Sequence, residues 1–210
     1  TNANGKVTYG IYKDGQKNGM FTDYFTNGKI KFKGRFVNNK EEGLHSTYYE
    51  NARLKSEMNY QNGLLHGQCR HYYENGNPKS EVMYSGGLRE GWCRYYDEAG
   101  NKEESEWRNG KIWNGKLTDI RDNETCSESY KNGQKNGNQS CKTNDGSESK
   151  SEFYIDGVPD STWHYLQSNG MEQFMHYEKG ILKKKRILSK HLETIELYQD
   201  HHKTEETEYT

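Results

Sequence analysis

The chain has little aliphatic material and almost no proline. Hydrophobic residues make up 30% of its 210 residues, and there are 2 prolines. Average globular domains are about 45–50% apolar with glycine included, and the 22 glycines here do not close that gap, so we expect no single thick core. Disorder is not expected either, because disordered chains are poor in aromatics and this chain has 17 Tyr, 6 Phe and 4 Trp. The apolar surface must be buried in a thin arrangement.

Charge of one sign and long apolar runs are also lacking. The 30 basic and 31 acidic residues give a net charge of -1, whereas a dedicated nucleic-acid binder usually carries a basic excess, so no nucleic-acid partner is expected. No stretch approaches the roughly 18 apolar residues of a membrane-spanning helix. Because the sequence starts at Thr1 and not at Met, we expect a preceding segment in the gene; a cleaved signal or a chosen boundary of the expressed segment would each explain this, and both stay open.

A short motif, an aromatic residue followed by two residues and a glycine, repeats along the chain every 23 or 24 residues. Its eight aromatic positions are Tyr12, Phe36, Tyr60, Tyr84, Trp107, Tyr130, Tyr154 and Tyr177. The Phe36 copy ends in Asn39, and Asn also tolerates positive φ. A second glycine follows four or five residues later in most copies, with Ser161 in the last of these slots, and a further turn signal such as Asn75-Gly76 lies in mid-repeat.

Each repeat therefore predicts two strands, joined by a tight turn and followed by a looser one. Asn-Gly favours the type I′ hairpin turn, in which both central residues have φ > 0. In the second predicted strand of one repeat, Ser80, Val82 and Tyr84 alternate with Glu81, which is typical of a half-solvated antiparallel sheet. Tyrosines aligned on the first strands are expected to stack into a thin core; they are Tyr24, Tyr48, Tyr72 and Tyr96.

Stacked hairpins predict an all-β fold, an elongated single-layer antiparallel sheet of about eight consecutive hairpins. We expect this array to span residues 1–182. Residues 183–210 are expected to form a degenerate capping hairpin or a tail, first basic and then acidic, with a frayed end after Lys203. Edge strands at both ends of an open sheet would permit dimerisation, and the oligomeric state stays open.

The repeat at Gly67–Glu90, with the sequence GQCRHYYENGNPKSEVMYSGGLRE, resembles the MORN repeat in its bacterial variant form. The resemblance covers about residues 9–182. It implies a β-hairpin repeat fold. Units of the eukaryotic form resemble these and occur in membrane-associated and scaffold proteins, whereas the bacterial variant is commonly assigned to antitoxin or immunity components of toxin systems. The repeat near Asn123 departs by losing its Asn-Gly turn, and the next has Lys142 where others have Tyr.

The four cysteines fall into two pairs with different expectations. Cys126 lies in a second strand and Cys141 in the first strand of the next repeat, so the two are expected on adjacent strands; a disulfide is expected in an exported protein and thiols in a cytosolic one. Cys69 and Cys93 occupy equivalent slots two strands apart, about 9–10 Å. This exceeds the roughly 7 Å between Cα atoms that a disulfide allows, so no bond is expected there.

The sequence offers weak signals for a metal and none for catalysis. Cys69 and His71 share a strand face, and His45 and Cys93 lie in the same column, but a column spacing of about 10 Å is too wide for one tetrahedral ion. The pair His201-His202 is a weak signal in the tail. Serine-nucleophile, phosphate-loop and zinc-protease motifs are absent. We therefore expect no metal, no cofactor and no enzymatic activity.

A partner-binding stripe is expected on the sheet face that is not used for self-packing. Tyr, Trp and Arg are enriched at interaction hot spots. The candidate residues are Tyr49, Arg70, His71, Tyr73, Trp92, Arg94 and Tyr95. The alternative is that a single-layer sheet partly buries both faces through its own curvature. A membrane surface is a second candidate partner, through the basic run Lys183, Lys184, Lys185 and Arg186, although acidic residues after it would cancel much of the field.

These observations predict a non-enzymatic protein-binding module. The resemblance implies an immunity or antitoxin role, in which one extended face covers a protein toxin or effector. Inhibitors of basic nucleases tend to be acidic, so the near-neutral charge favours a toxin that attacks membrane or cell wall. We expect a bacterial cell-envelope protein, periplasmic or a lipoprotein, with a cytoplasmic antitoxin as the alternative. A cell-envelope or membrane-surface scaffold and a carbohydrate-binding protein also stay open.

Overall fold

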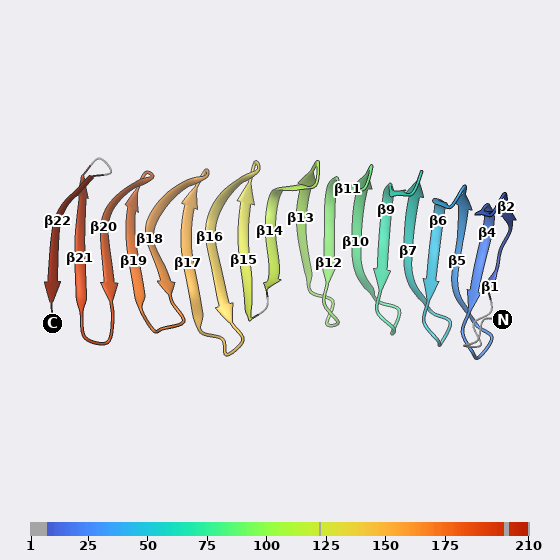
Figure 1. The fold of residues 1–210 in the computed structure, drawn as a ribbon, viewed down its shortest axis with the longest axis horizontal. Coiled ribbons are helices and arrows are strands. Elements are labelled where there is room, and N and C mark those ends of the chain that lie inside the picture. The colour runs from blue at the N-terminus through green and yellow to red at the C-terminus, as the bar shows by residue number, and fades with distance from the viewer. Residues whose placement is uncertain (1–7, 122, 200–201, 210) are drawn as a thin grey trace. The chain divides into compact units, whose positions relative to one another are not determined.

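The computed structural model describes residues 8–121, 123–199 and 202–209, and these form strands, turns and loops. The chain divides into two compact units, unit 1 (residues 1–111) and unit 2 (residues 112–210). Among the described residues, no helix is long and apolar enough to cross a membrane. Within each unit, successive strands pair antiparallel in hairpins (Figure 1). The predicted fold class, all-β with consecutive antiparallel hairpins, is confirmed.

Unit 1 contains the first thirteen strands. They are β1 (Thr8–Tyr9), β2 (Tyr12–Lys13), β3 (Gln16–Lys17), β4 (Gly19–Tyr24), β5 (Ile30–Val37), β6 (Lys40–Tyr48), β7 (Leu54–Gln61), β8 (Leu64–Leu65), β9 (Gly67–Tyr72), β10 (Pro78–Ser85), β11 (Leu88–Arg89), β12 (Gly91–Tyr96) and β13 (Lys102–Arg108).

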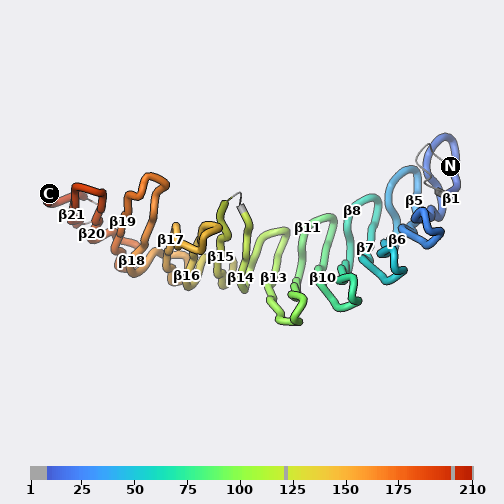
Figure 2. The backbone as a smooth tube through the Cα atoms, turned by 90° about the horizontal axis from the view of Figure 1, so that it is seen from below, coloured from blue at the N-terminus to red at the C-terminus, as the bar shows by residue number. Residues whose placement is uncertain are grey.

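Unit 2 holds nine strands, the first of which begins at the unit boundary. They are β14 (Lys111–Arg121), β15 (Glu124–Lys131), β16 (Gln134–Thr143), β17 (Glu148–Ile155), β18 (Val158–Leu166), β19 (Glu172–Glu178), β20 (Ile181–Leu188), β21 (Glu193–Gln199) and β22 (His202–Tyr209). The backbone trace of Figure 2 shows the same succession of hairpins in each unit.

The two kinds of turn are the reverse of the prediction. The turn between repeats is the tight one: Gln61 pairs with Leu64, and the two loop residues Asn62 and Gly63 have φ of 53° and 84°. These values fit a type I′ turn. In the mid-repeat turns only the last residue is left-handed, such as Gly76 with φ 96°, whose N–H donates to the Tyr73 carbonyl at 2.9 Å. Longer mid-repeat loops around a type I turn explain this difference.

Lys179 is the first of the two loop residues in one of the tight turns between repeats, and its φ is 50°. A left-handed conformation costs an ordinary L-residue about 1–2 kcal/mol, whereas Asn adopts it more readily. Lys179→Asn is therefore expected to raise the free energy of unfolding by about 0.5–1 kcal/mol, measured by urea denaturation. The matched reverse change, Asn132→Lys at the equivalent position (φ 53°), is expected to lower it by a similar amount. Equal stability of the two variants would contradict the argument.

The core follows a different row of residues from the predicted tyrosine column. The residue two positions after the glycine that opens a repeat, or after Ser161 in one repeat, is deeply buried in most repeats. These buried residues are Phe21, His45, Cys69, Cys93, Gln139 and Trp163. They pack against the motif aromatics, as in the ring contact between His45 and Tyr60 at 4.8 Å.

The predicted tyrosine column does not form the core. Tyr24, Tyr48, Tyr72 and Tyr96 are only half-buried. Each is the last residue of its strand, next to an exposed turn, so the strand end leaves its ring partly open to solvent.

The C-terminal region continues the array of unit 2. Strand β20 runs through the expected boundary at residue 183 and pairs with both β19 and β21. The residues after Lys203, which were expected to be frayed, lie in β22. This strand pairs with β21 up to Tyr209, although every described side chain on it is exposed. Backbone pairing along β21 holds this segment in place without burial. The predicted His201 position lies outside the described residues.

A candidate binding groove on unit 1

The seven predicted partner-binding residues do not share a face. We call the face that carries Cys69, Val82 and Cys93 the inner face of unit 1, and its opposite the outer face. Adjacent residues of a strand point to opposite faces. Arg70, Trp92 and Arg94 therefore lie on the outer face, whereas Tyr49, His71, Tyr73 and Tyr95 line grooves on the inner face. The single stripe expected from the sequence is thus divided between two surfaces.

The outer-face arginines are engaged in a ladder of ion pairs. Arg94 contacts Glu104 at 2.7 Å and Glu81 at 3.5 Å, and Arg70 contacts Glu81 at 3.9 Å and Glu57 at 3.8 Å. Hydrogen bonding to Arg94 holds the pKa of the Glu104 carboxyl below its usual range. These groups are half-buried and still in contact with solvent, so the pairs add little stability. They do neutralise one another, which leaves the outer face with little net charge to offer a partner.

The inner face carries two adjoining grooves with volumes of about 730 Å³ and 350 Å³. Tyr49, Lys55 and His71 line both of them, so the two grooves adjoin, and we call them together the hollow. Its floor includes rings and small hydroxyl side chains brought side by side by strand pairing, among them Ser56 and Ser80 on either side of His71.

Three β-bulges place lysines at this hollow. In β10, Pro78 pairs with Tyr72 and Ser80 with His71, so Lys79 between them is left without a partner in the ladder. The same shift skips Lys55 in β7 and Lys31 in β5. A bulge disrupts the local alternation and re-aims the side chain of the extra residue. Lys31 and Lys55 line the larger groove, and Lys55 and Lys79 the smaller one.

Each of these lysines lies over an aromatic ring that follows the preceding strand. The Nζ atoms of Lys31, Lys55 and Lys79 lie 5.5, 5.5 and 5.3 Å from the ring centroids of Phe25, Tyr49 and Tyr73. These distances fit cation–π contacts. The three rings are half-buried and the three lysines are exposed. We call these six residues the lysine–aromatic row.

Hydrogen bonds fix the tyrosine rings of the row. The Tyr49 hydroxyl donates to the Tyr72 carbonyl at 2.8 Å, and the Tyr73 hydroxyl donates to the Tyr96 carbonyl at 2.7 Å. Each bond ties one repeat to the next. The rings are therefore positioned before any ligand arrives, which lowers the entropic cost of binding.

Lysines outnumber carboxylates among the residues that line the two grooves, with Lys31, Lys55 and Lys79 against Glu50 and Glu74. Burial, followed by the charges of Lys79 and Lys55, lowers the pKa of His71. Only the smaller part of this pKa shift, the part due to the lysines, reflects positive charge near His71.

Acidification is expected to destabilise the protein through His71. Its folded-state pKa lies below the unfolded value of about 6.5, so the unfolded state binds the proton first and the free energy of unfolding falls as the pH drops through this range. Wild type is expected to lose more stability between pH 7.5 and 5 than His71→Gln, measured by urea denaturation at each pH. Equal losses of stability in wild type and His71→Gln would contradict this role of His71. The other titratable side chains that line the two grooves are Lys31, Lys55, Lys79, Glu50, Glu74, Tyr48, Tyr49, Tyr72, Tyr73, Tyr95 and Tyr96.

The three lysines of the row were missed from the sequence. The sequence does contain a pattern that could have indicated them: Phe25, Tyr49 and Tyr73 recur every 24 residues, and each is followed six residues later by a lysine. Strict alternation along a strand nevertheless assigns Lys55 to the face opposite Ser56, and only the bulge places it in the groove.

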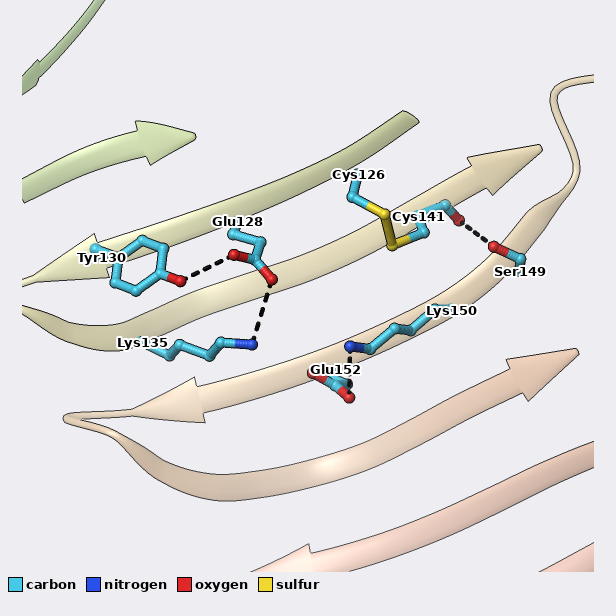
Figure 3. Close-up of a disulfide and its surroundings, with 8 residues drawn as sticks. All are labelled: Cys126, Glu128, Tyr130, Lys135, Cys141, Ser149, Lys150 and Glu152. Atoms are coloured by element: carbon cyan, nitrogen blue, oxygen red, sulfur yellow. Dashed lines mark hydrogen bonds and ion pairs between the residues drawn. A yellow bond between two sulfur atoms is a disulfide. The ribbon is translucent and has the colours of Figure 1, made fainter. Parts of the chain in front are cut away.

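In unit 2, Cys126 and Cys141 are directly opposed on β15 and β16 and form a disulfide with Cα atoms 4.0 Å apart (Figure 3). Glu124 lies close enough to complete a group of three metal-type ligands, but both sulfurs are bonded to each other. Cys69 and Cys93 are free thiols, and burial raises the pKa of each. Their burial argues against reactive thiolates.

Two carboxylates near the disulfide of unit 2 have basic and phenolic partners (Figure 3). Glu128 accepts from the Tyr130 hydroxyl at 2.8 Å and contacts Lys135 at 3.4 Å. Glu152, 5% exposed, contacts Lys150 at 3.0 Å. It also accepts from the hydroxyls of Tyr154 and Tyr165. Burial, with the Glu152 charge next in effect, raises the pKa of Tyr154 to about 12. These networks give each carboxylate a basic and a phenolic partner, which suits a structural role.

The basic run of β20 is divided between the two faces of its strand. Lys185 contacts Glu196 at 3.4 Å, and Arg186 contacts Glu193 at 2.6 Å. Lys184 is exposed and Lys183 is half-buried. The run therefore presents less free positive charge than its sequence indicates.

Comparison with known families identifies repeats in unit 1. The MORN repeat variant pattern matches residues 17–38, 41–62 and 65–85. Each matched segment contains one lysine and its ring from the lysine–aromatic row. No curated protein matches the chain. The chain therefore contains three repeats of the MORN variant type, and MORN repeats are generally modules that bind proteins or membranes.

Proposed function

We propose that this protein is a non-enzymatic module that binds a partner protein through the inner-face groove of unit 1. The observation that carries the proposal is the lysine–aromatic row, in which three exposed lysines lie over three half-buried rings at equal sequence spacing. Aromatic side chains in a concave site supply contact area, and the fixed rings require little ordering on binding.

We further propose that the partner is a bacterial toxin and that this protein neutralises it. The Cys126–Cys141 disulfide supports an oxidising compartment such as the bacterial envelope, because disulfides are rare in the cytosol. The net charge of -1 supports a membrane- or wall-attacking toxin over a basic nuclease. A membrane-surface scaffold has weaker support, since Lys185 and Arg186 are paired with acidic residues of β21.

Co-purification followed by a rescue assay tests this function. Tagged protein recovered from its native cells at about 0.5 M salt, where exposed charges are mostly screened, is expected to carry one stoichiometric protein partner. Expression of that partner alone is expected to arrest growth of a bacterial host, and co-expression of this protein is expected to restore it. A partner without toxicity would overturn the toxin role, and recovery of lipid alone would favour the scaffold.

A further inference from the structure

The lysine–aromatic row has a defined length of three repeats. One repeat beyond Tyr73, the equivalent position holds Asp97. Lys79 has no counterpart there: Lys102 pairs with Tyr96 as Pro78 pairs with Tyr72, and Glu103 pairs with Tyr95 as Ser80 pairs with His71, with no bulge residue between them. The fourth repeat therefore lacks both the aromatic–lysine pair and the β-bulge that turns the lysine toward the groove. Two carboxylates at that end would repel the continuation of an anionic ligand.

Negative charges alternate with the positive ones along the larger groove. Glu50 and Glu74 are exposed and line it together with Lys31 and Lys55. A surface of continuous negative charge, such as an anionic membrane, would meet these glutamates as well as the lysines. A chain that carries separated anionic groups, with neutral residues between them, would satisfy the lysines and avoid the glutamates.

The spacing of the row matches one particular backbone conformation. Equivalent residues of successive hairpins are two strands apart, which at about 4.8 Å per strand is about 9.6 Å. A polyproline II helix has three residues per turn and rises about 3.1 Å per residue, so its residues i, i+3 and i+6 lie on one side about 9.3 Å apart. Aromatic-lined grooves are also the sites that receive this conformation in known peptide complexes.

We infer that the lysine–aromatic groove binds an acidic polyproline II segment of the partner protein, with a carboxylate at every third residue over three turns. Each carboxylate would meet one of Lys31, Lys55 and Lys79, and the intervening residues would pack against the rings of Phe25, Tyr49 and Tyr73. This inference rests on the proposed protein-binding function and specifies the partner's chemistry.

A synthetic nine-residue peptide of three Glu-Pro-Pro triplets, labelled with a fluorophore, tests the inference by fluorescence anisotropy with the full chain. We expect it to bind at least about tenfold more tightly than a peptide of equal composition with its three glutamates contiguous, and than the Gln-Pro-Pro analogue. Equal binding of the two acidic peptides would overturn the spacing argument. Binding to phosphatidylglycerol vesicles without binding to any peptide would overturn it in favour of a membrane surface.

Matched variants locate the binding site. Lys55→Glu is expected to weaken binding of the triplet peptide by about tenfold or more, and Lys55→Met, which keeps the apolar stem, by less. The control Lys33→Glu makes the same charge change on the outer face of β5, opposite Thr22 and Ser46, and is expected to change binding by less than about twofold. Circular dichroism checks that each variant is folded.

The same variants separate failure of the inference from failure of the proposed function. If Lys55→Glu retains the co-purified partner at wild-type yield, the protein-binding function stands and the assignment of this groove is overturned. If wild type recovers no protein partner and binds no peptide, both are overturned.

Discussion

Replacing Trp163 with alanine is expected to lower the free energy of unfolding by about 3–5 kcal/mol, the range for truncating a buried tryptophan. Trp163 is 8% exposed and lies between the rings of Tyr154 and Tyr177, with centroid distances of 5.0 and 4.6 Å. Its indole N–H donates to the Phe153 carbonyl at 3.0 Å. The change would leave a cavity and also remove the donor to that carbonyl. Urea denaturation followed by circular dichroism measures the loss.

Trp92→Ala is the matched control for this experiment. Trp92 is 52% exposed on the outer face of unit 1, and surface substitutions usually change stability by less than about 0.5 kcal/mol. A loss at Trp92 as large as that at Trp163 would show that the outer face of unit 1 is covered in solution and would contradict the assignment of the two faces.

Breaking the Cys126–Cys141 disulfide is expected to cost about 3 kcal/mol of stability. The bond closes a loop with a sequence separation of 15, and the chain-entropy estimate for a loop of that length is about 3 kcal/mol. Dithiothreitol is therefore expected to shift the urea midpoint of wild type downward. The double variant Cys126→Ala/Cys141→Ala is expected to start near the lower midpoint and not to respond to the reductant.

Cysteines of unit 1 provide the control for the disulfide. Cys69→Ala/Cys93→Ala removes two buried free thiols and is expected to lower stability while keeping the response to dithiothreitol. Titration of unfolded, unreduced protein with a thiol reagent is expected to count two thiols. A count of four would refute the disulfide.

Much of the fold was predictable because the repeat is local. Glycine and asparagine at fixed offsets set where the chain turns, and the alternation of residues such as Ser80 and Glu81 sets which face is wet. Adjacent strands and register then follow, which is why Cys126 and Cys141 were expected side by side. The turn types were assigned to the wrong positions, since Asn-Gly occurs both in the two-residue turns and in the longer mid-repeat loops.

The candidate site was only partly predictable. Of the residues predicted for partner binding, Tyr49, His71, Tyr73 and Tyr95 line the inner-face grooves, whereas Arg70, Trp92 and Arg94 were grouped with them although they lie on the opposite face. Residue type alone carries no information about the face, and one residue of offset reverses it.

The sequence by itself determined the length of the repeat, the hairpins and the strand neighbours, because these depend on turn residues and on a period of two. The tertiary structure alone decided where Lys31, Lys55 and Lys79 point. Each is the extra residue of a bulge, and a bulge exists only in relation to the strand paired beside it. The pairing of one repeat's two strands thus turns three lysines toward the rings of the inner face and creates the groove.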